Sequence, residues 1–239
     1  MQITLQNVRK SYGLKDISLS ISPGECIGVV GINGAGKSTF LNCLAGIVGP
    51  DIGKILFDEQ PFDRSNLELR RRILMIPDSP IYDSSQNFLS LCKDYAFAYQ
   101  IKMSQLKEPV AELLKLFDVG QYMYHPLGNL SRGHAYKLSL IPLLAIRPEL
   151  WLLDEPFASG MDVLGMRTLQ DQFRSATADG RSIVFTTQIL ELAEKIANRL
   201  VILHQGKVVA AGTMNELRSQ SRSSGDLQDI VQLLVAESA

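Results

Sequence analysis

The 239-residue sequence has no excess of basic residues and no apolar run long enough to cross a membrane. Its 24 lysines and arginines are balanced by 25 aspartates and glutamates, for a formal charge of −1. Because proteins that neutralise phosphate backbones carry a basic surplus, nucleic acid is not expected as a partner. The longest apolar stretch, residues 138–146, is interrupted by Ser139 and Pro142 and is half the ~20 residues of a membrane-spanning helix, so no direct membrane insertion is expected.

The sequence also lacks paired cysteines and the apolar segment of a secretory signal. Cys26, Cys43 and Cys92 are odd in number and far apart, which fits neither a disulfide framework nor a metal site. We therefore expect three buried thiols and a reducing, cytosolic compartment. The first ten residues alternate as in a strand, so no secretory signal is expected. With 46% apolar residues, the chain can bury the core of a globular protein.

Apolar patterning predicts an α/β fold with a largely parallel sheet. Alternating apolar residues over 3–8 and 14–21 predict half-buried antiparallel strands at the N-terminus. The continuous apolar run 26–30 predicts a strand buried on both faces, and it leads into a glycine-rich loop and a helix. Further strand signals lie in the second half of the chain, at residues 150–153, 183–186, 200–203 and 208–211.

A mostly helical subdomain is expected as an insertion over about residues 79–135. Apolar residues recur there at helical spacing, first over 88–99 and again over 110–117.

The C-terminal part, residues 219–239, is expected to lie outside the main domain of residues 1–218. Ser219 to Gly225 is rich in serine and polar residues and predicts a flexible linker. Residues 227–234 carry one apolar stripe, which predicts a short amphipathic helix that folds onto its own domain.

A phosphate-binding loop is predicted by residues 31–39, GINGAGKST, which match G-x-x-x-x-G-K-[ST] between a buried strand and a helix. The glycines let backbone N–H groups surround an anion at the helix N-terminus. Lys37 is expected to reach the terminal phosphates, and the Ser38 hydroxyl to ligate Mg²⁺. The residues expected to bind the nucleotide here are Asn33, Gly34, Ala35, Gly36, Lys37, Ser38 and Thr39. This motif alone leaves kinases, GTPases and ATPases open.

Two acidic residues follow the predicted strand 150–153, and ligands of open α/β sheets bind at such strand ends. Asp154 is expected to hold Mg²⁺, and Glu155 to polarise the attacking water. Trp151 is expected to pack in the sheet.

The order of these motifs around Leu130-Ser131-Arg132-Gly133-His134 resembles the nucleotide-binding subunit of ABC transporters, whose signature is L-S-G-G-Q. The resemblance covers about residues 1–215. It implies an ABC ATPase domain with a P-loop NTPase core, an N-terminal antiparallel β subdomain and the inserted helical subdomain.

The resemblance also implies a head-to-tail dimer, with each ATP held between one subunit's phosphate loop and the signature of the other. Ser131 and Gly133 would form the second anion cradle, and Asp162, in a segment like the D-loop, would face the partner's site. Tyr12 would stack on adenine. The expected ligands are therefore ATP and Mg²⁺.

Three motifs depart from the family pattern. In the signature, Arg132 and His134 replace a glycine and the glutamine, and His134 is expected on the helix surface. Asp78 stands where the family has the Q-loop glutamine, and its carboxylate can still accept a hydrogen bond from a metal-bound water. Gln188 stands where the family has a histidine on the γ-phosphate, and the chain's histidines all lie elsewhere. Gln188 can donate an N–H but cannot become a cation, so hydrolysis slower by a factor on the order of 10²–10⁴ is expected.

The resemblance implies an ATPase that drives transport through separate membrane subunits, held on the cytoplasmic face of the inner membrane. Residues 79–88 and the helix that follows would receive a short helix of the membrane subunit. Ile81, Tyr82, Phe88 and Leu89 are the candidate contacts, and core packing is the favoured role for Phe88 and Leu89. The compact chain favours a bacterial exporter over an importer, whereas homodimer and heterodimer both stay open. The alternative is a regulatory or immunity protein that uses ATP as a switch and hydrolyses little.

Overall fold

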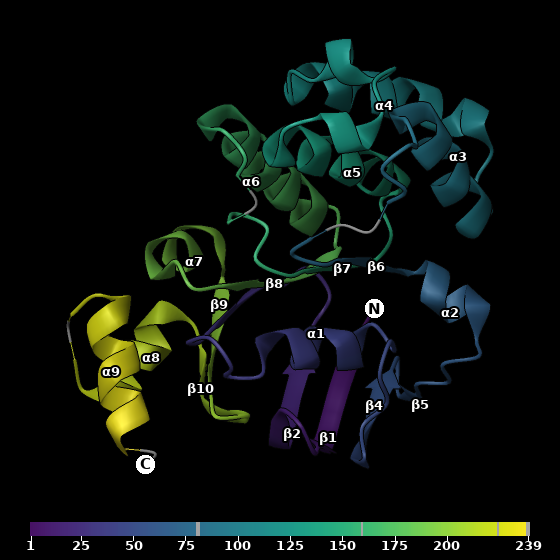
Figure 1. Ribbon diagram of the computed structural model, residues 1–239. Helices are drawn as coiled ribbons and strands as arrows, with labels where there is room; N and C mark the ends of the chain where they lie inside the picture. The colour runs from purple at the N-terminus through teal and green to yellow at the C-terminus, as the bar shows by residue number, and fades with distance from the viewer. Residues whose placement is uncertain (80–81, 159, 224, 238–239) are drawn as a thin grey trace.

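Two sheets form the centre of the molecule in the computed structural model, which describes residues 1–79, 82–158, 160–223 and 225–237 (Figure 1). The smaller sheet is antiparallel and has the strand order β2 (Leu14–Ile21), β1 (Ile3–Lys10), β4 (Ile52–Phe57) and β5 (Gln60–Pro61). The larger sheet has the order β10 (Lys207–Gly212), β9 (Arg199–His204), β3 (Cys26–Val30), β8 (Ser182–Thr187), β7 (Leu150–Leu153) and β6 (Ile73–Ile76).

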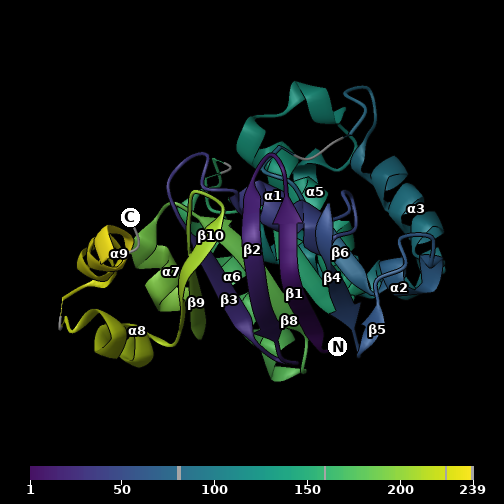
Figure 2. The same ribbon diagram turned by 90° about the horizontal axis from the view of Figure 1, so that it is seen from below.

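The larger sheet is parallel from β9 to β6, and only its β10 edge pairs antiparallel among the described strands. Strands β3, β7 and β8 are buried along their whole length, as continuous apolar runs require when both faces of a sheet are covered. The predicted α/β class with an N-terminal antiparallel part is confirmed. Figure 2 shows β2, β1 and β4 side by side from below.

Helix α1 (Lys37–Leu44) packs between the two sheets. Its Phe40, Leu41 and Leu44 join a core with the inward residues of β1 and β2 and with Ile27 and Val29 of β3. Each such buried side chain contributes about 1.5–3 kcal/mol. The helix that follows the phosphate loop is therefore anchored on both sides.

The other described helices surround these sheets. They are α2 (Leu67–Arg71), α3 (Phe88–Ala98), α4 (Met103–Leu116), the short 3-10 helices η1 (Gly120–Tyr122) and η2 (Leu127–Asn129), α5 (Arg132–Ile146), α6 (Val163–Ala178), α7 (Leu190–Ile196), α8 (Met214–Ser221) and α9 (Leu227–Glu237). The expected helical insertion is present, and its expected end at residue 135 falls inside α5.

Helices α3 to α6 lie on the opposite side of the larger sheet from α1 (Figure 1). Trp151 and Phe173 meet edge to face in this layer, and the Trp151 indole N–H donates to the Pro148 carbonyl at 2.9 Å. Trp151 therefore packs in the sheet, as predicted. Phe88 is fully buried, whereas Tyr82 and Leu89 are partly buried, and Ile81 lies outside the described residues.

The C-terminal helix α9 packs onto its own domain, as expected. Leu227, Ile230 and Leu234 are buried with Val30 at the end of β3. The linker predicted over 219–225 is wrong at its start, because α8 continues to Ser221, whose side chain is buried. Helix α8 is nucleated by a capping box in which Thr213 and Glu216 bond each other's backbone N–H groups.

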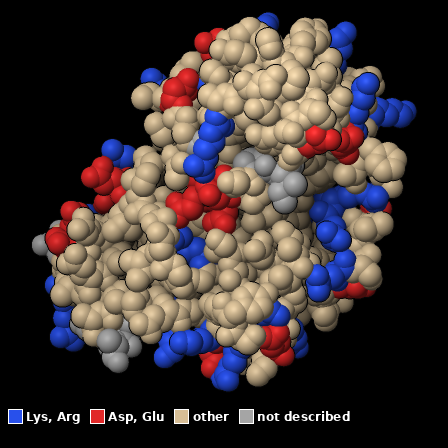
Figure 3. Space-filling view, in the orientation of Figure 1, with Lys and Arg blue, Asp and Glu red and all other residues tan. Residues whose placement is uncertain are grey.

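The three cysteines are buried and unpaired, as expected. Burial raises the pKa of Cys26 and Cys92 to about 12 each and that of Cys43 to about 11. No helix among the described residues combines the length and apolar character that a bilayer crossing requires. Figure 3 shows Lys and Arg mixed with Asp and Glu over the face that it presents, in line with the balanced composition.

Candidate functional site

One pocket of about 370 Å³ brings together most of the residues that the sequence singles out for nucleotide chemistry. Its lining residues are Tyr12, Asn33, Gly34, Ala35, Gly36, Lys37, Ser38, Thr39, Asp78, Asp154, Glu155 and Gln188. Asp78, Asp154 and Gln188 follow the neighbouring strands β6, β7 and β8, and the loop follows β3. The pocket therefore lies at the carboxyl edge of the parallel sheet, where open α/β folds bind their ligands.

The phosphate loop keeps its backbone donors free of side-chain caps. Gly36 precedes α1 with φ +105°, and no side chain caps the helix N-terminus. A Cβ on Gly36 would lie 2.3 Å from the Gly13 carbonyl oxygen. Gly34 has φ +78°, and no atom lies within 4 Å of the place where its Cβ would be. Because the first N–H groups of a helix have no intrahelical acceptor, this end of α1 fits a phosphate.

Lys37 is 7% exposed and is held at the mouth of the loop. Its Nζ donates to the Gly31 carbonyl at 2.8 Å and lies 3.4 Å from both the Ile32 carbonyl and Glu155 Oε1. A buried ammonium needs such partners, and the phosphates of a nucleotide would supply stronger ones. Lys37 is therefore placed to exchange its hydrogen bonds to backbone carbonyls for bonds to the phosphates of a nucleotide.

Thr186 in β8 fixes both acidic residues that end β7. Its hydroxyl donates to Asp154 Oδ1 at 2.6 Å and accepts from the Glu155 N–H at 2.9 Å. Glu155 adopts φ +45°, a left-handed conformation that is rare for non-glycine residues. Backbone strain of this kind concentrates at functional sites, and here it turns the Glu155 carboxylate toward Lys37.

Gln188 binds the Glu155 carboxylate with two donors. Its backbone N–H lies 3.2 Å from Oε2, and its side-chain Nε2 lies 3.3 Å from Oε1. In this arrangement both donors of Gln188 are engaged by Glu155. Gln188 and Glu155 are 33 positions apart in the sequence, and no sequence motif predicts that they pair.

The residues predicted to hold Mg²⁺, namely Ser38, Asp78 and Asp154, all line the pocket. No group of three or more His, Cys, Asp or Glu side chains among the described residues could hold a metal by itself. Mg²⁺ commonly takes one or two carboxylates together with water and substrate phosphates, so this donor set fits Mg²⁺ bound with a nucleotide. Bound there, the metal would neutralise phosphate charge.

Asp78 has a partner that the sequence reading missed. Arg132 Nη2 lies 3.1 Å from its Oδ1, so two of the departures from the family pattern contact each other. Both side chains are well exposed, which makes the pair a weak one. Opposite charges at two altered positions are the signal that could have suggested it.

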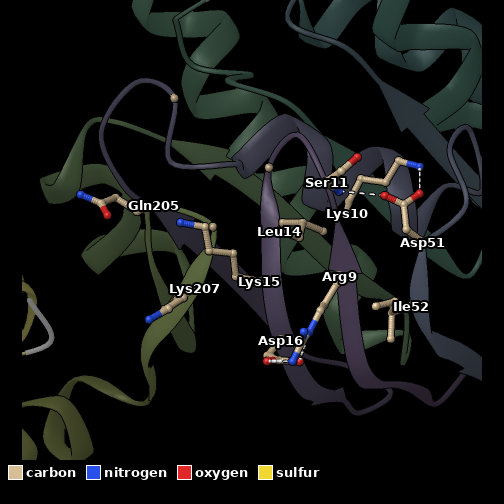
Figure 4. A pocket seen from close by; sticks show the side chains of 13 residues that line it. Arg9, Lys10, Ser11, Leu14, Lys15, Asp16, Asp51, Ile52, Gln205 and Lys207 are labelled. Atoms are coloured by element: carbon tan, nitrogen blue, oxygen red, sulfur yellow. Dashed lines mark hydrogen bonds and ion pairs between the residues drawn. The ribbon is translucent and has the colours of Figure 1, made fainter.

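The turn that carries Tyr12 is held by Asp51, the residue before β4. Asp51 accepts from Lys10 Nζ at 2.6 Å and from the Ser11 N–H at 2.8 Å, along one side of a neighbouring 790 Å³ pocket (Figure 4). The bond from Lys10, followed by those from Ser11, lowers the pKa of Asp51 to about 2. Lys10 Nζ lies 5.1 Å from the centre of the Tyr12 ring, which is 63% exposed. Tyr12 is therefore fixed at its base and open to a stacking partner.

Ser131, Gly133 and Asp162 do not line this pocket. Ser131 caps α5, accepting from the His134 N–H at 3.3 Å, and Asp162 caps α6, accepting from the Gly165 N–H at 2.8 Å. Asp162 also accepts a hydrogen bond from Nζ of the buried Lys137 at 3.0 Å, a contact that the sequence does not predict.

The sequence predicts His134 on the surface of its helix. The residue is partly buried there, and its ring stacks on Tyr122 with 4.3 Å between the ring centroids. Stacking of this kind fixes the ring against η1. Ser159, in the segment that resembles the D-loop, lies outside the described residues.

Gly133 is required by the close approach of two backbones. A Cβ at this position would lie 2.2 Å from the Gly160 carbonyl oxygen. Gly133→Ala should therefore push the loop before α6 away from α5 and lower the free energy of unfolding by about 1–3 kcal/mol. Denaturant unfolding measures this. Gly120→Ala is the control, because nothing lies within 4 Å of a Cβ there, and equal losses in the two variants would contradict the argument.

Comparisons with known proteins agree on one family. The family model described as ABC transporter matches residues 14–158. The chain is 30% identical over 227 residues to the ABC-type transporter ATP-binding protein EcsA of Bacillus subtilis, covering 95% of this chain and 92% of that protein. It is 30% identical to the daunorubicin resistance ATP-binding protein DrrA3 of Streptomyces coeruleorubidus, covering 96% and 73% of the two chains. It is 30% identical to the Nod factor export ATP-binding protein I of Paraburkholderia xenovorans, covering 90% and 72%.

Solved structures share the fold. The structure of an ATP binding subunit of an ABC transporter superposes with a TM-score of 0.92 at 26% identity, covering 98% of this chain and 100% of that chain. The dimeric structure of a bacterial ABC transporter cassette has a TM-score of 0.79 at 23% identity, covering 89% and 98%.

Proposed function

Because this chain belongs to the ABC transporter family, as an ATP-binding and ATP-hydrolysing subunit, we propose that it powers export through separate membrane subunits. It would bind Mg²⁺-ATP, dimerise on it and hydrolyse it slowly, as a peripheral protein on the cytoplasmic face of the inner membrane. Export is favoured by relatives whose names state it or imply it, the Nod factor export and daunorubicin resistance proteins.

The observation that carries the proposal is the joint placement of four groups in one pocket. Lys37 at the phosphate loop, Asp154 and Glu155 at the end of β7 and Gln188 after β8 all line it. A cation for phosphates, a carboxylate for Mg²⁺ and a second carboxylate for the attacking water are what ATP hydrolysis needs. Lys37 Nζ lies 3.4 Å from Glu155 Oε1, so the cation and this carboxylate are side by side in the pocket.

The position of the signature supports a dimer. Ser131 and Arg132 are exposed at the start of α5, outside the pocket of their own subunit. The N-terminus of α5 offers free N–H groups and a favourable dipole to an anion. A second cassette facing the opposite way would bring its phosphate loop to this end of α5, so that ATP bridges the two. That cassette is either a copy of this chain or a related subunit.

The membrane subunit would dock beside the start of α3. The partly buried Tyr82 and Leu89 are the candidate contacts there, because Phe88 belongs to the core. Closing of the dimer on ATP would pull two such membrane subunits together, and hydrolysis would reset them.

Gln188→His tests the proposal of slow hydrolysis. A histidine can carry a positive charge to the γ-phosphate, so turnover should rise by about 10²-fold. The measurement is steady-state phosphate release from the subunit assembled with its membrane partner. The Glu155→Gln variant supplies the background, and unchanged turnover in Gln188→His would contradict the assigned role of Gln188.

A regulatory or immunity protein that uses ATP as a switch is the second candidate. It is favoured by the two bonds with which Gln188 holds Glu155, because they occupy the carboxylate that a water must approach. The same assay separates the two candidates. Turnover of the assembled wild-type complex at the Glu155→Gln level supports the switch, and turnover clearly above that level supports the exporter ATPase.

A further inference from the structure

Tyr136 places a hydroxyl group without a partner in the interior of the protein. The residue lies in α5 and is 1% exposed, and its hydroxyl makes no hydrogen bond to any described residue. Burial of an unpaired hydroxyl destabilises a fold, and phenylalanine would fill the same volume without that penalty. A buried hydroxyl without a partner is therefore a candidate donor for a group that moves when a ligand binds.

The surroundings of Tyr136 indicate which partner this is. Arg132 and Tyr136 are four residues apart in α5 and therefore lie on the same face of the helix. On that face Arg132 bonds Asp78, at the end of β6. The neighbouring strand β7 ends in Asp154, whose N–H donates to the Ile76 carbonyl of β6 at 2.8 Å. Asp78 and Asp154, two of the three carboxylates that line the nucleotide pocket, are thus on the side of the sheet end that faces this part of α5.

The electrostatics of the tyrosine agree with this position. Burial is the largest cause that raises the pKa of Tyr136, and the negative charges of Asp78 and Asp154 raise it further. The hydroxyl is therefore neutral and keeps its proton, which makes it a donor. The carboxylates whose charges act on it are those of Asp78 and Asp154, two residues predicted to hold Mg²⁺.

We propose that Tyr136 is a positioning residue for Mg²⁺, whose hydroxyl donates to the Asp78 carboxylate once Mg²⁺-nucleotide fills the pocket. The inference rests on the proposed function, because it takes Asp78 to accept a hydrogen bond from water that is bound to Mg²⁺. In this structure Arg132 bonds Asp78. With Mg²⁺-nucleotide in the pocket, Asp78 would exchange Arg132 for Tyr136.

The exchange is easy because the existing bond is weak. The side chains of Asp78 and Arg132 are 48% and 60% exposed, so water and salt screen their attraction. The tyrosine, in contrast, is fixed by its packing in α5 and acts in a low-dielectric interior, where a hydrogen bond to a carboxylate is strong.

The test is the Mg²⁺-dependence of nucleotide binding by the isolated subunit, measured with a fluorescent ATP analogue. Tyr136→Phe should reduce the gain in affinity that Mg²⁺ provides by about tenfold, the effect of one hydrogen bond to a charged group. Affinity without Mg²⁺ should not change. The thermal unfolding midpoint of the empty variant should stay the same or rise, because the substitution removes only an unpaired hydroxyl.

Tyr99→Phe is the matched control. Tyr99 is a mostly buried tyrosine of the same subdomain, and its hydroxyl donates to the Ile73 carbonyl at 2.8 Å. This variant should lower the unfolding midpoint and leave the Mg²⁺-dependence intact, which is the opposite pattern. If Tyr136→Phe keeps the full Mg²⁺ effect of the wild type, the inference is overturned and the proposed function stands. If the wild type itself binds nucleotide equally with and without Mg²⁺, both fall.

Discussion

Glu155→Gln should lower the rate of ATP hydrolysis about 10³-fold while nucleotide binding stays intact. The amide matches the carboxylate in size, and its one oxygen can still accept one of the two bonds from Gln188, so the pocket largely keeps its shape. It cannot take a proton from water, which removes the general base. Phosphate release at saturating Mg²⁺-ATP measures the rate, and a fluorescent nucleotide measures the binding.

Glu112→Gln is the control for this substitution, because Glu112 is exposed on α4, away from the pocket. It removes the same charge and should leave turnover unchanged. If Glu155→Gln kept more than a tenth of the wild-type rate, another residue would have to activate the water.

Lys37→Ala should weaken nucleotide binding by at least about 10²-fold. The ammonium is nearly buried at the phosphate loop and makes charge-assisted hydrogen bonds, each worth about 1.5–3 kcal/mol. Its loss also leaves Glu155 without the cation 3.4 Å away, so the pocket becomes more negative and repels phosphates. Isothermal titration with ATP in the presence of Mg²⁺ measures the effect.

Lys54→Ala provides the same change of charge on an exposed position of β4 and should bind ATP like the wild type. Similar losses in the two variants would mean that overall charge, rather than a contact at the loop, sets the affinity.

Local patterns were enough to predict the frame of the site. The run Cys26–Val30 is fully buried and leads into α1, and the acidic pair follows β7, because hydrophobic periodicity and loop motifs act over short stretches of chain. Parallel strands align their carboxyl ends, so the convergence of these residues also follows from the sequence.

Contacts between distant segments could not be predicted in this way. The bond from Arg132 to Asp78 spans 54 residues, and the bonds from Gln188 to Glu155 span 33. Such pairs depend on how α5 and β8 lie against the ends of β6 and β7, which is set by packing of the whole core. The lack of a partner for the Tyr136 hydroxyl depends on the same packing and could not be predicted either.

The wrong start of the C-terminal linker has a local cause. Residues 219–225 are rich in serine, which favours loops in general. The helix before them starts at a Thr213–Glu216 capping box and buries Leu217 and Ser221, so tertiary packing carries it past the expected end. The spacing of threonine and glutamate was the signal in the sequence.

The central claim is that ATP joins two cassettes, one through its phosphate loop and the other through its Ser131 helix start. Sedimentation velocity of the Glu155→Gln subunit, alone and mixed with a cognate cassette, tests it most directly. With saturating Mg²⁺-ATP the subunit should sediment as a dimer in one of these two samples. With Mg²⁺-ADP it should sediment as a monomer in both. A monomer under every one of these conditions would contradict the account.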